Sequence, residues 1–259
     1  MSKITNAFTA GKAFIPFITC GDPNLETTER VVLAMAEAGA DIIELGIPFS
    51  DPTAEGPVIQ AASERALENG TTTDDIFDMV RRLREKISTP LVFMTYANVV
   101  FSYGTERFLS ICEKLDVNGL ILPDVPYEEK DEFFDCCTAH KVDMISLIAP
   151  TSHDRIRMIA KDAVGFVYCV SSMGVTGVRS EIKTDLGEMV RLVKETNPDI
   201  PCAIGFGIST PEQAYQMTRI ADGAIVGSAI VRIVAEQGEN AVEAVREYVS
   251  AMKQACLRG

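Results

Sequence analysis

Histidine is scarce in this 259-residue sequence, which has only His140 and His153. Serine-protease-like catalytic triads use histidine as the general base, so the chain offers few candidates for such a triad. Both histidines lie in polar segments, and a surface position is the simplest interpretation for each. Histidine-based nucleophilic catalysis is therefore disfavoured.

Recognisable metal-binding and disulfide patterns are also missing. The seven cysteines form no CxxC motif and no Cys/His cluster that indicates zinc. Their odd number and the adjacent pair Cys136 and Cys137 do not resemble a disulfide framework. We expect reduced thiols that are mostly buried, and no metal centre.

Long apolar runs and an excess of basic residues are absent as well. No stretch reaches the roughly 18 apolar residues that a membrane span needs, and the N-terminal MSKITNAFTAGK has no signal-peptide core. The net charge of −13 disfavours a long nucleic-acid or anionic-membrane surface, because such partners select for dense lysine and arginine. We expect a cytoplasmic protein that binds neither, although a small local anion site remains possible.

The sequence does contain a repeated unit: a short apolar run, a polar or glycine-bearing turn and a longer amphipathic segment. Eight such runs are predicted to be buried parallel strands: AFIPFIT from Ala13, ADIIELG from Ala40, PLVFMTY from Pro90, NGLILPD from Asn118, VDMISLI from Val142, VGFVYCV from Val164, IPCAIGFG from Ile200 and ADGAIVG from Ala221. Eight units without a linker favour one (β/α)8-barrel (TIM barrel) domain over residues 1–259. An open doubly wound sheet is the alternative.

Helix signals fill the intervals between these runs. Thr210, Pro211 and Gln213 combine a threonine cap, a first-turn proline and a glutamine at the third position. After the second run the interval has room for an extra helical segment, and after the sixth it holds the long loop SSMGVTGVRSEIK, a candidate lid. The predicted helices are 56–69, 73–86, 105–116, 127–140, 152–161 and 185–196.

Two glutamates near the end of the second run are the main catalytic candidates. Glu44 interrupts an otherwise apolar strand, and if it faces the barrel interior, loss of solvent should raise its pKa. Glu55 follows in a loop that Pro48, Pro52 and Pro57 restrict. The alternatives are that Glu44 reaches solvent at the strand end, and that Glu55 and Asp51 are ordinary loop charges.

Glycine-bearing loops follow the sixth, seventh and eighth runs and predict a phosphate site. They contain Gly174 and Gly177, then Gly205 and Gly207, and then Gly227 followed by Ser228. In this fold, phosphate commonly binds the loops after the seventh and eighth strands, against the N-terminus of a short helix. Each loop alone also fits a plain turn. The apolar and aromatic residues at the strand ends fit core filling or the lining of a flat apolar ligand, with Asp124 as a polar rim.

The order of the motifs resembles that of the tryptophan synthase α subunits over nearly the whole chain. The motifs are FIPFITCGDP, ELGIPFSDPTAEGPVIQ, FMTYANVVFSYG, GLILPDVP, VYCVSSMGVTG, GFGIST and ADGAIVGSAIV, of which the second is the most specific. The resemblance implies cleavage of indole-3-glycerol phosphate into indole and glyceraldehyde 3-phosphate, with no cofactor in this chain.

The resemblance also implies residue roles. Glu44 matches the family's general acid/base, and Glu55 stands where the family usually has an aspartate, a departure that we expect the loop to compensate. Thr176 and Gly174 would belong to the lid, and Gly177, Gly207, Gly227 and Ser228 would hold the phosphate. The residues that would surround the indole ring are Phe17, Ile59, Met94, Tyr96, Ile121 and Tyr168.

By the same resemblance, the chain would pass indole to a β subunit that carries pyridoxal phosphate (PLP), in an αββα heterotetramer. The segment 48–52, with Asn98 and Pro126, would face that subunit. Two alternatives are a subunit that mainly activates its partner and has weak lyase activity because of Glu55, and another phosphate-binding barrel isomerase or synthase. The latter often has lysine at a strand end, and no predicted strand end here presents one.

Overall fold

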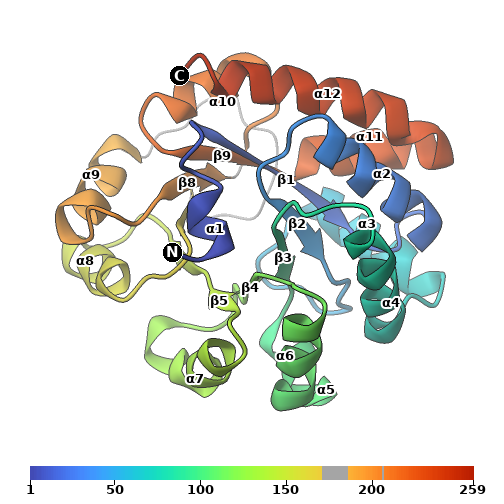
Figure 1. Ribbon diagram of the computed structural model, residues 1–259, viewed down its shortest axis with the longest axis horizontal. Helices are drawn as coiled ribbons and strands as arrows, with labels where there is room; N and C mark the ends of the chain where they lie inside the picture. Colours follow the sequence, from blue (N-terminus) through green and yellow to red (C-terminus); the bar gives the residue numbers. More distant parts are fainter. Residues whose placement is uncertain (171–185, 206) are drawn as a thin grey trace.

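The computed structural model describes residues 1–170, 186–205 and 207–259, and its centre is a parallel sheet surrounded by helices (Figure 1). Every strand pairing is parallel, as predicted. The strands are β1 (Ala13–Thr19), β2 (Ile43–Gly46), β3 (Leu91–Met94), β4 (Gly119–Ile121), β5 (Asp143–Met144), β6 (Ser146–Ile148), β7 (Val167–Val170), β8 (Cys202–Gly205) and β9 (Gly223–Val226).

The sheet closes on itself through the fifth predicted strand. Its order is β5-β4-β3-β2-β1-β9-β8-β7-β6, so the strands at its two ends are β5 and β6. Only Ile145 separates these two in the chain, and its N–H donates to the Leu120 carbonyl at 2.9 Å. One run therefore pairs with β4 through its first half and with β7 through its second. The barrel is confirmed, and the open doubly wound sheet is wrong.

The helices other than α1 form the outer layer of the barrel. Their bounds are α1 (Lys3–Asn6), α2 (Leu25–Glu37), α3 (Pro57–Glu68), α4 (Thr73–Arg84), α5 (Ala97–Tyr103), α6 (Thr105–Lys114), α7 (Asp131–Ala139), α8 (His153–Lys161), α9 (Leu186–Thr196), α10 (Pro211–Thr218), α11 (Ser228–Gln237) and α12 (Ala241–Cys256). The two helices predicted after the second run are confirmed as α3 and α4. The single helix predicted over 127–140 is wrong at its start, because Tyr127–Glu129 forms a separate 3-10 turn before α7.

Local capping explains several helix starts. The predicted cap of α10 is confirmed as a capping box, in which Thr210 accepts from the Gln213 N–H and the Gln213 side chain accepts from the Thr210 N–H. Thr72 and Asp75 form the same reciprocal pair at α4. These bonds satisfy first-turn N–H groups that have no partner within the helix, so each helix begins at a defined residue.

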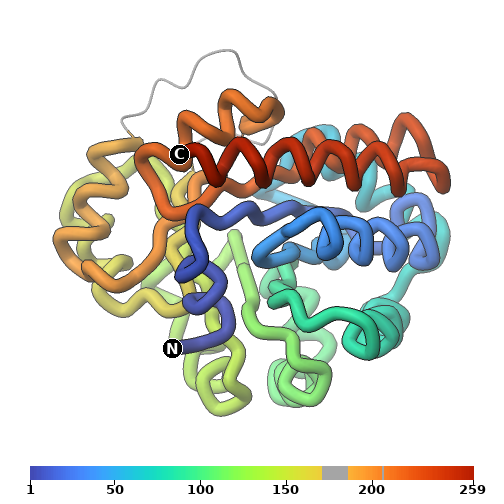
Figure 2. Tube along the Cα trace, turned by 45° about the horizontal axis from the view of Figure 1, so that its top comes forward, coloured from blue at the N-terminus to red at the C-terminus, as the bar shows by residue number. Residues whose placement is uncertain are grey.

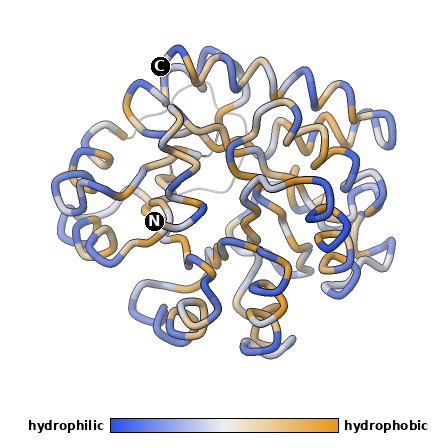
Figure 3. Tube along the Cα trace, in the orientation of Figure 1, coloured by the Kyte–Doolittle hydropathy of each residue, from blue (hydrophilic) through white to orange (hydrophobic). Residues whose placement is uncertain are grey.

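Two apolar layers fill the molecule. One lies between the sheet and the helices, and the other fills the barrel interior with residues such as Ile15, Ile42, Val92 and Ile225. Figure 3 shows the same division, with hydrophobic strands at the centre and mainly hydrophilic turns at the periphery. α12 packs along α2, and Figure 2 shows the two side by side.

The short N-terminal helix α1 closes the N-terminal end of the barrel. Its Ile4 is fully buried in the interior layer, and a Cβ on Gly119 of β4 would lie 2.7 Å from the Ile4 Cδ1. The Thr5 hydroxyl donates to the Gly165 carbonyl at 3.1 Å. Sequence periodicity does not predict this plug because the helix has only four residues.

The cysteines and the membrane prediction are tested by the same structure. All seven cysteines are free, and six of them are buried, as expected; Cys136 is partly exposed. Over the described residues, no helix has the length and apolarity needed to cross a membrane.

Candidate functional site

Parallel strands bring their C-terminal ends to one mouth of the barrel, where Glu44 lies on β2. Glu44 is paired with Phe17 on β1 and Val92 on β3, and only 1% of it is exposed. Burial, followed by the negative charge of Glu55, raises the pKa of Glu44 to about 8. The alternative in which Glu44 escapes to solvent is wrong.

One oxygen of Glu44 has no hydrogen-bond partner among the described residues. This atom, Oε2, is buried, and the same holds for Oε2 of Glu55. An unsatisfied buried acceptor costs about 1–3 kcal/mol. These two carboxylate oxygens, with the Thr19 hydroxyl that is likewise unpartnered among the described residues at the end of β1, therefore indicate a ligand-binding position at the mouth.

Glu55 lies in the loop between β2 and α3 and is also buried. Its backbone carbonyl accepts from the Gln60 side chain at 2.8 Å, and the Tyr96 hydroxyl accepts from the Ala54 N–H at 3.1 Å. Burial raises the pKa of Glu55 to about 7, and a hydrogen bond with Tyr96 acts in the opposite direction. Asp51 is exposed and accepts from Ser50, so it behaves as an ordinary loop charge.

An ion pair between the partly exposed Arg65 and the buried Asp22 holds the helix that follows this loop. Arg65 of α3 donates through two nitrogens to the two Asp22 oxygens at 2.8 and 2.7 Å, and Asp22 is buried after β1. Asn69 adds a bond to the Pro23 carbonyl at 2.7 Å. A bidentate pair fixes direction as well as distance, so it anchors α3 and the Glu55 loop to β1. This pair was not predicted, because no local sequence pattern relates two positions so far apart in the chain.

The six predicted ring-binding residues are all buried. Five of them, Phe17, Ile59, Met94, Ile121 and Tyr168, belong to the interior layer of the barrel. The sixth, Tyr96, lies with its ring 5.1 Å from that of Phe49. The structure therefore brings five of the six together with Glu44, whose charge contributes, after burial, to a raised pKa of Tyr168.

Two glycines make room for the aromatic rings at the mouth. A Cβ on Gly46 would lie 2.5 Å from Phe17 Cζ, and a Cβ on Gly205 would lie 2.5 Å from the Tyr168 hydroxyl oxygen. Neither close approach is possible with a larger residue. The strand ends at β2 and β8 are thus shaped so that rings lie across them.

Part of the predicted phosphate site lies within the described residues. Gly227 is the N-cap of α11 and makes no side-chain cap bond, and Ser228 is the first residue of that helix. Gly207 has φ of +84°, which favours glycine, and all three residues are partly exposed. First-turn N–H groups and the helix dipole favour an anion here. Gly174, Thr176 and Gly177 lie outside the described residues, as does Phe206.

A cavity of about 500 Å³ extends to the loop that carries Glu55 but is lined by neither acid. It lies among the segments that follow β4 and β6 and the helices α7 and α8, and reaches Ala54, Ile145 and Val170. None of the six predicted ring-binding residues lines it. We place the candidate site at the acids, because unsatisfied polar atoms indicate chemistry more directly than apolar volume does.

The predicted partner-facing residues are mostly at the surface. Pro48 is buried, but Ser50, Asp51, Asn98 and Pro126 are exposed. Phe101, one turn from Asn98 on α5, is 71% exposed. Asp124 fixes the start of α5, because both of its oxygens accept from the Ala97 N–H at 3.0 and 3.1 Å.

Comparison with known proteins gives a consistent result. The family model described as tryptophan synthase alpha chain matches residues 5–257. A tryptophan synthase alpha chain of Lacticaseibacillus casei is 49% identical over 98% of this chain and 96% of its own length. A Mycobacterium tuberculosis tryptophan synthase structure aligns with a TM-score of 0.90 at 32% identity, covering 100% of this chain and 99% of the other. A tryptophan synthase subunit alpha structure from Legionella pneumophila aligns with a TM-score of 0.86 at 35% identity, covering 99% of this chain and 98% of the other.

Proposed function

Because the chain belongs to the tryptophan synthase alpha chain family, which acts in tryptophan biosynthesis, we propose that it cleaves indole-3-glycerol phosphate into indole and glyceraldehyde 3-phosphate. The observation that carries this reaction is the pair of buried carboxyl groups at the barrel mouth, each with a raised pKa and an oxygen that has no partner in the part of the chain that the structure describes. This carbon–carbon lyase reaction requires proton transfer at two substrate atoms and no cofactor in this chain.

Glu44 supplies the proton transfers. Its pKa of about 8 keeps it mainly protonated at neutral pH, so it donates a proton to C3 of the indole ring. The resulting carboxylate then accepts the proton of the glycerol hydroxyl as the C–C bond breaks. A pKa near the working pH suits a group that must both give and take a proton.

Glu55 stabilises the positive charge that develops on the indole nitrogen. It is less deeply buried than Glu44, and its Tyr96 hydrogen bond favours the ionised form. Neighbouring carboxyl groups whose pKa values differ divide into an acid and an anion. The two glutamates thus take different roles because their surroundings differ.

The remaining predicted residues hold the substrate. Phe17, Ile59, Met94, Tyr96, Ile121 and Tyr168 enclose the indole ring, and Gly177, Gly207, Gly227 and Ser228 bind the phosphate. Thr176 and Gly174 belong to a lid that excludes water during the reaction. The buried positions of the six ring residues and the helix start at Ser228 support this assignment.

The product indole passes to a PLP-dependent β subunit, in an αββα heterotetramer in the cytoplasm. Exposed Asn98, Phe101 and Pro126, with Ser50 and Asp51, support a docking surface, in which Phe101, 71% exposed, supplies a large apolar side chain for a partner to cover. The partner-activating alternative with weak activity is not favoured, since Glu55 is buried and within electrostatic range of Glu44. The family match sets aside another barrel isomerase or synthase.

The test is indole release from indole-3-glycerol phosphate by the purified chain, with and without the β subunit. We expect turnover by the parent and a loss of about 10³-fold in kcat for Glu44→Gln, the range for removing a general acid/base. Glu64→Gln, an exposed glutamate on α3, is the matched control and should keep full activity. Equal activity of Glu44→Gln and the parent, with the fold intact by circular dichroism, would refute the role of Glu44.

A further inference from the structure

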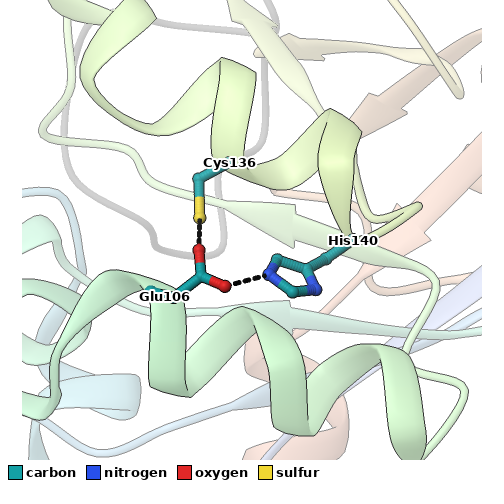
Figure 4. A group of neighbouring side chains, drawn as sticks. All are labelled: Glu106, Cys136 and His140. Atoms are coloured by element: carbon teal, nitrogen blue, oxygen red, sulfur yellow. Dashed lines mark hydrogen bonds and ion pairs between the residues drawn. The ribbon is translucent and has the colours of Figure 1, made fainter.

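Three side chains of types that bind metal ions, a carboxylate, a thiol and an imidazole, meet between α6 and α7 (Figure 4). Glu106 Oε1 lies 2.9 Å from His140 Nε2, and Glu106 Oε2 accepts from the Cys136 thiol at 3.3 Å. The three ligand atoms all lie within 4.8 Å of one another. A single ion placed among them would contact a carboxylate, a thiolate and an imidazole.

The helices explain why these residues converge. Cys136 and His140 are four positions apart, on α7 and its C-cap, so their side chains lie on one face. Glu106 lies in the first turn of α6, which packs against α7. The cluster was not predicted from the sequence, because its third ligand, Glu106, lies on a separate helix.

A second carboxylate orients the histidine from the other side. Glu113 Oε2 lies 2.9 Å from His140 Nδ1, and Lys141 Nζ donates to Glu113 Oε1 at 2.8 Å. Histidines that bind metal through one ring nitrogen usually donate the other N–H to a carboxylate or carbonyl. Once the Nε2 proton is lost, the hydrogen bond from Nδ1–H to Glu113 keeps the Nε2 lone pair directed toward Glu106 and Cys136.

We propose that Glu106, Cys136 and His140 form a Zn²⁺ site, with Glu113 as the orienting partner of His140 and water in the fourth position. Sulfur, nitrogen and carboxylate oxygen in a tetrahedral arrangement are ligands that zinc prefers. On binding, the Cys136 thiol proton and the His140 Nε2 proton leave to solvent. The sulfur and the Nε2 nitrogen then bond to the ion, and a Glu106 oxygen bonds to the ion in place of its hydrogen bonds to Cys136 and His140. The ion would fasten α6 to α7.

The site is accessible from solvent and is independent of the lyase reaction. Glu106 is exposed and Cys136 is partly exposed, so an ion can enter without unfolding the barrel. The other six cysteines are buried. Thiolate coordination by the folded chain is therefore assigned to Cys136.

The test is calorimetric titration of the EDTA-treated full chain with Zn²⁺, and with Co²⁺ as an absorption probe of thiolate coordination. We expect one ion per chain, a sulfur-to-cobalt charge-transfer band, and a higher Tm with Zn²⁺ because the ion binds the folded state. Cys136→Ser should remove the band, and both it and His140→Gln should weaken Zn²⁺ binding at least tenfold. Glu113→Gln should weaken it about tenfold, as loss of an orienting partner does.

The matched control is His153→Gln, which removes the chain's other histidine, an exposed residue at the start of α8, and should leave the Zn²⁺ affinity unchanged. Equal Zn²⁺ affinity of Cys136→Ser and the parent, or a parent spectrum without the charge-transfer band, would overturn the site. None of these readouts uses indole release, so failure here leaves the lyase proposal standing.

Discussion

Two acidic side chains near β2 lie in opposite surroundings: one is fully paired, and the other has an oxygen that is unpaired within the described part of the chain. The Asp41 carboxylate, just before β2, accepts hydrogen bonds from the Lys253 ammonium at 2.9 and 2.7 Å and from the Phe14 N–H at 2.7 Å. Glu44, inside β2, has a buried oxygen with no partner among the described residues. The first lies at the N-terminal end of the barrel and the second toward the mouth.

The difference separates charges that stabilise the fold from charges kept for chemistry. Asp222, just before β9, repeats the Asp41 arrangement: it pairs with Lys194 at 2.7 Å and accepts from the Cys202 N–H at 2.8 Å. Charges at the N-terminal face of such barrels commonly serve stability, and those at the C-terminal face catalysis. An unsatisfied buried carboxyl group costs stability, which is consistent with retention for activity.

Asp41→Asn should give the largest effect on stability. The change leaves the mostly buried Lys253 without its counter-charge, and breaking a buried pair from one side costs about 3 kcal/mol. Urea unfolding should show this loss, while kcat for indole release stays near the parent value. A large loss of kcat at unchanged stability would contradict the assignment of Asp41 to the fold.

The pH dependence of stability should reveal Glu44. Its pKa is raised from 4.5 unfolded to about 8 folded, so between these values the folded state holds a proton that the unfolded state has lost. The free energy of unfolding therefore falls as pH rises from about 4.5 to about 8. Glu55, with a pKa of about 7, adds to the slope up to that pH.

Glu44→Gln should reduce the fall in the free energy of unfolding with rising pH by an amount on the order of 2 kcal/mol. Urea unfolding of parent and variant at pH 5 and pH 8 measures the difference, and Glu64→Gln serves again as the exposed control. Parallel pH profiles for the parent and Glu44→Gln would show that the buried carboxyl group titrates as it does in the unfolded chain.

Glu55→Asp should give the smallest effect, about a tenfold loss in kcat. Glu55 is held by a loop fixed through Gln60 and Tyr96, so a shorter side chain withdraws the carboxylate by roughly an ångström. Glu55→Gln, which removes the charge, should lose about 100-fold. Indole release by the three proteins measures the series; a large gain for Glu55→Asp would show that the loop does not compensate for the longer side chain.

Much of the fold follows from local pattern. Apolar runs that alternate with amphipathic segments predict eight strands, and alternation within the second places Glu44 on the same face as Ile42. That this face is the barrel interior is shown by the structure. Capping residues predict the start of α10. The split of the fifth strand at Ile145, the α1 plug and the 3-10 turn at Tyr127–Glu129 were not predicted, because closure and packing determine them.

The sequence by itself determined the strand–helix repeat, the barrel and the presence of an acid within a buried strand, because periodicity and burial preference act between near neighbours. Only the tertiary structure decided which distant side chains meet: Asp22 with Arg65, Asp41 with Lys253, and Glu106 with Cys136 and His140. These contacts depend on which segments become neighbours when the barrel closes. Local sequence periodicity cannot predict them, because the partners are distant in the chain.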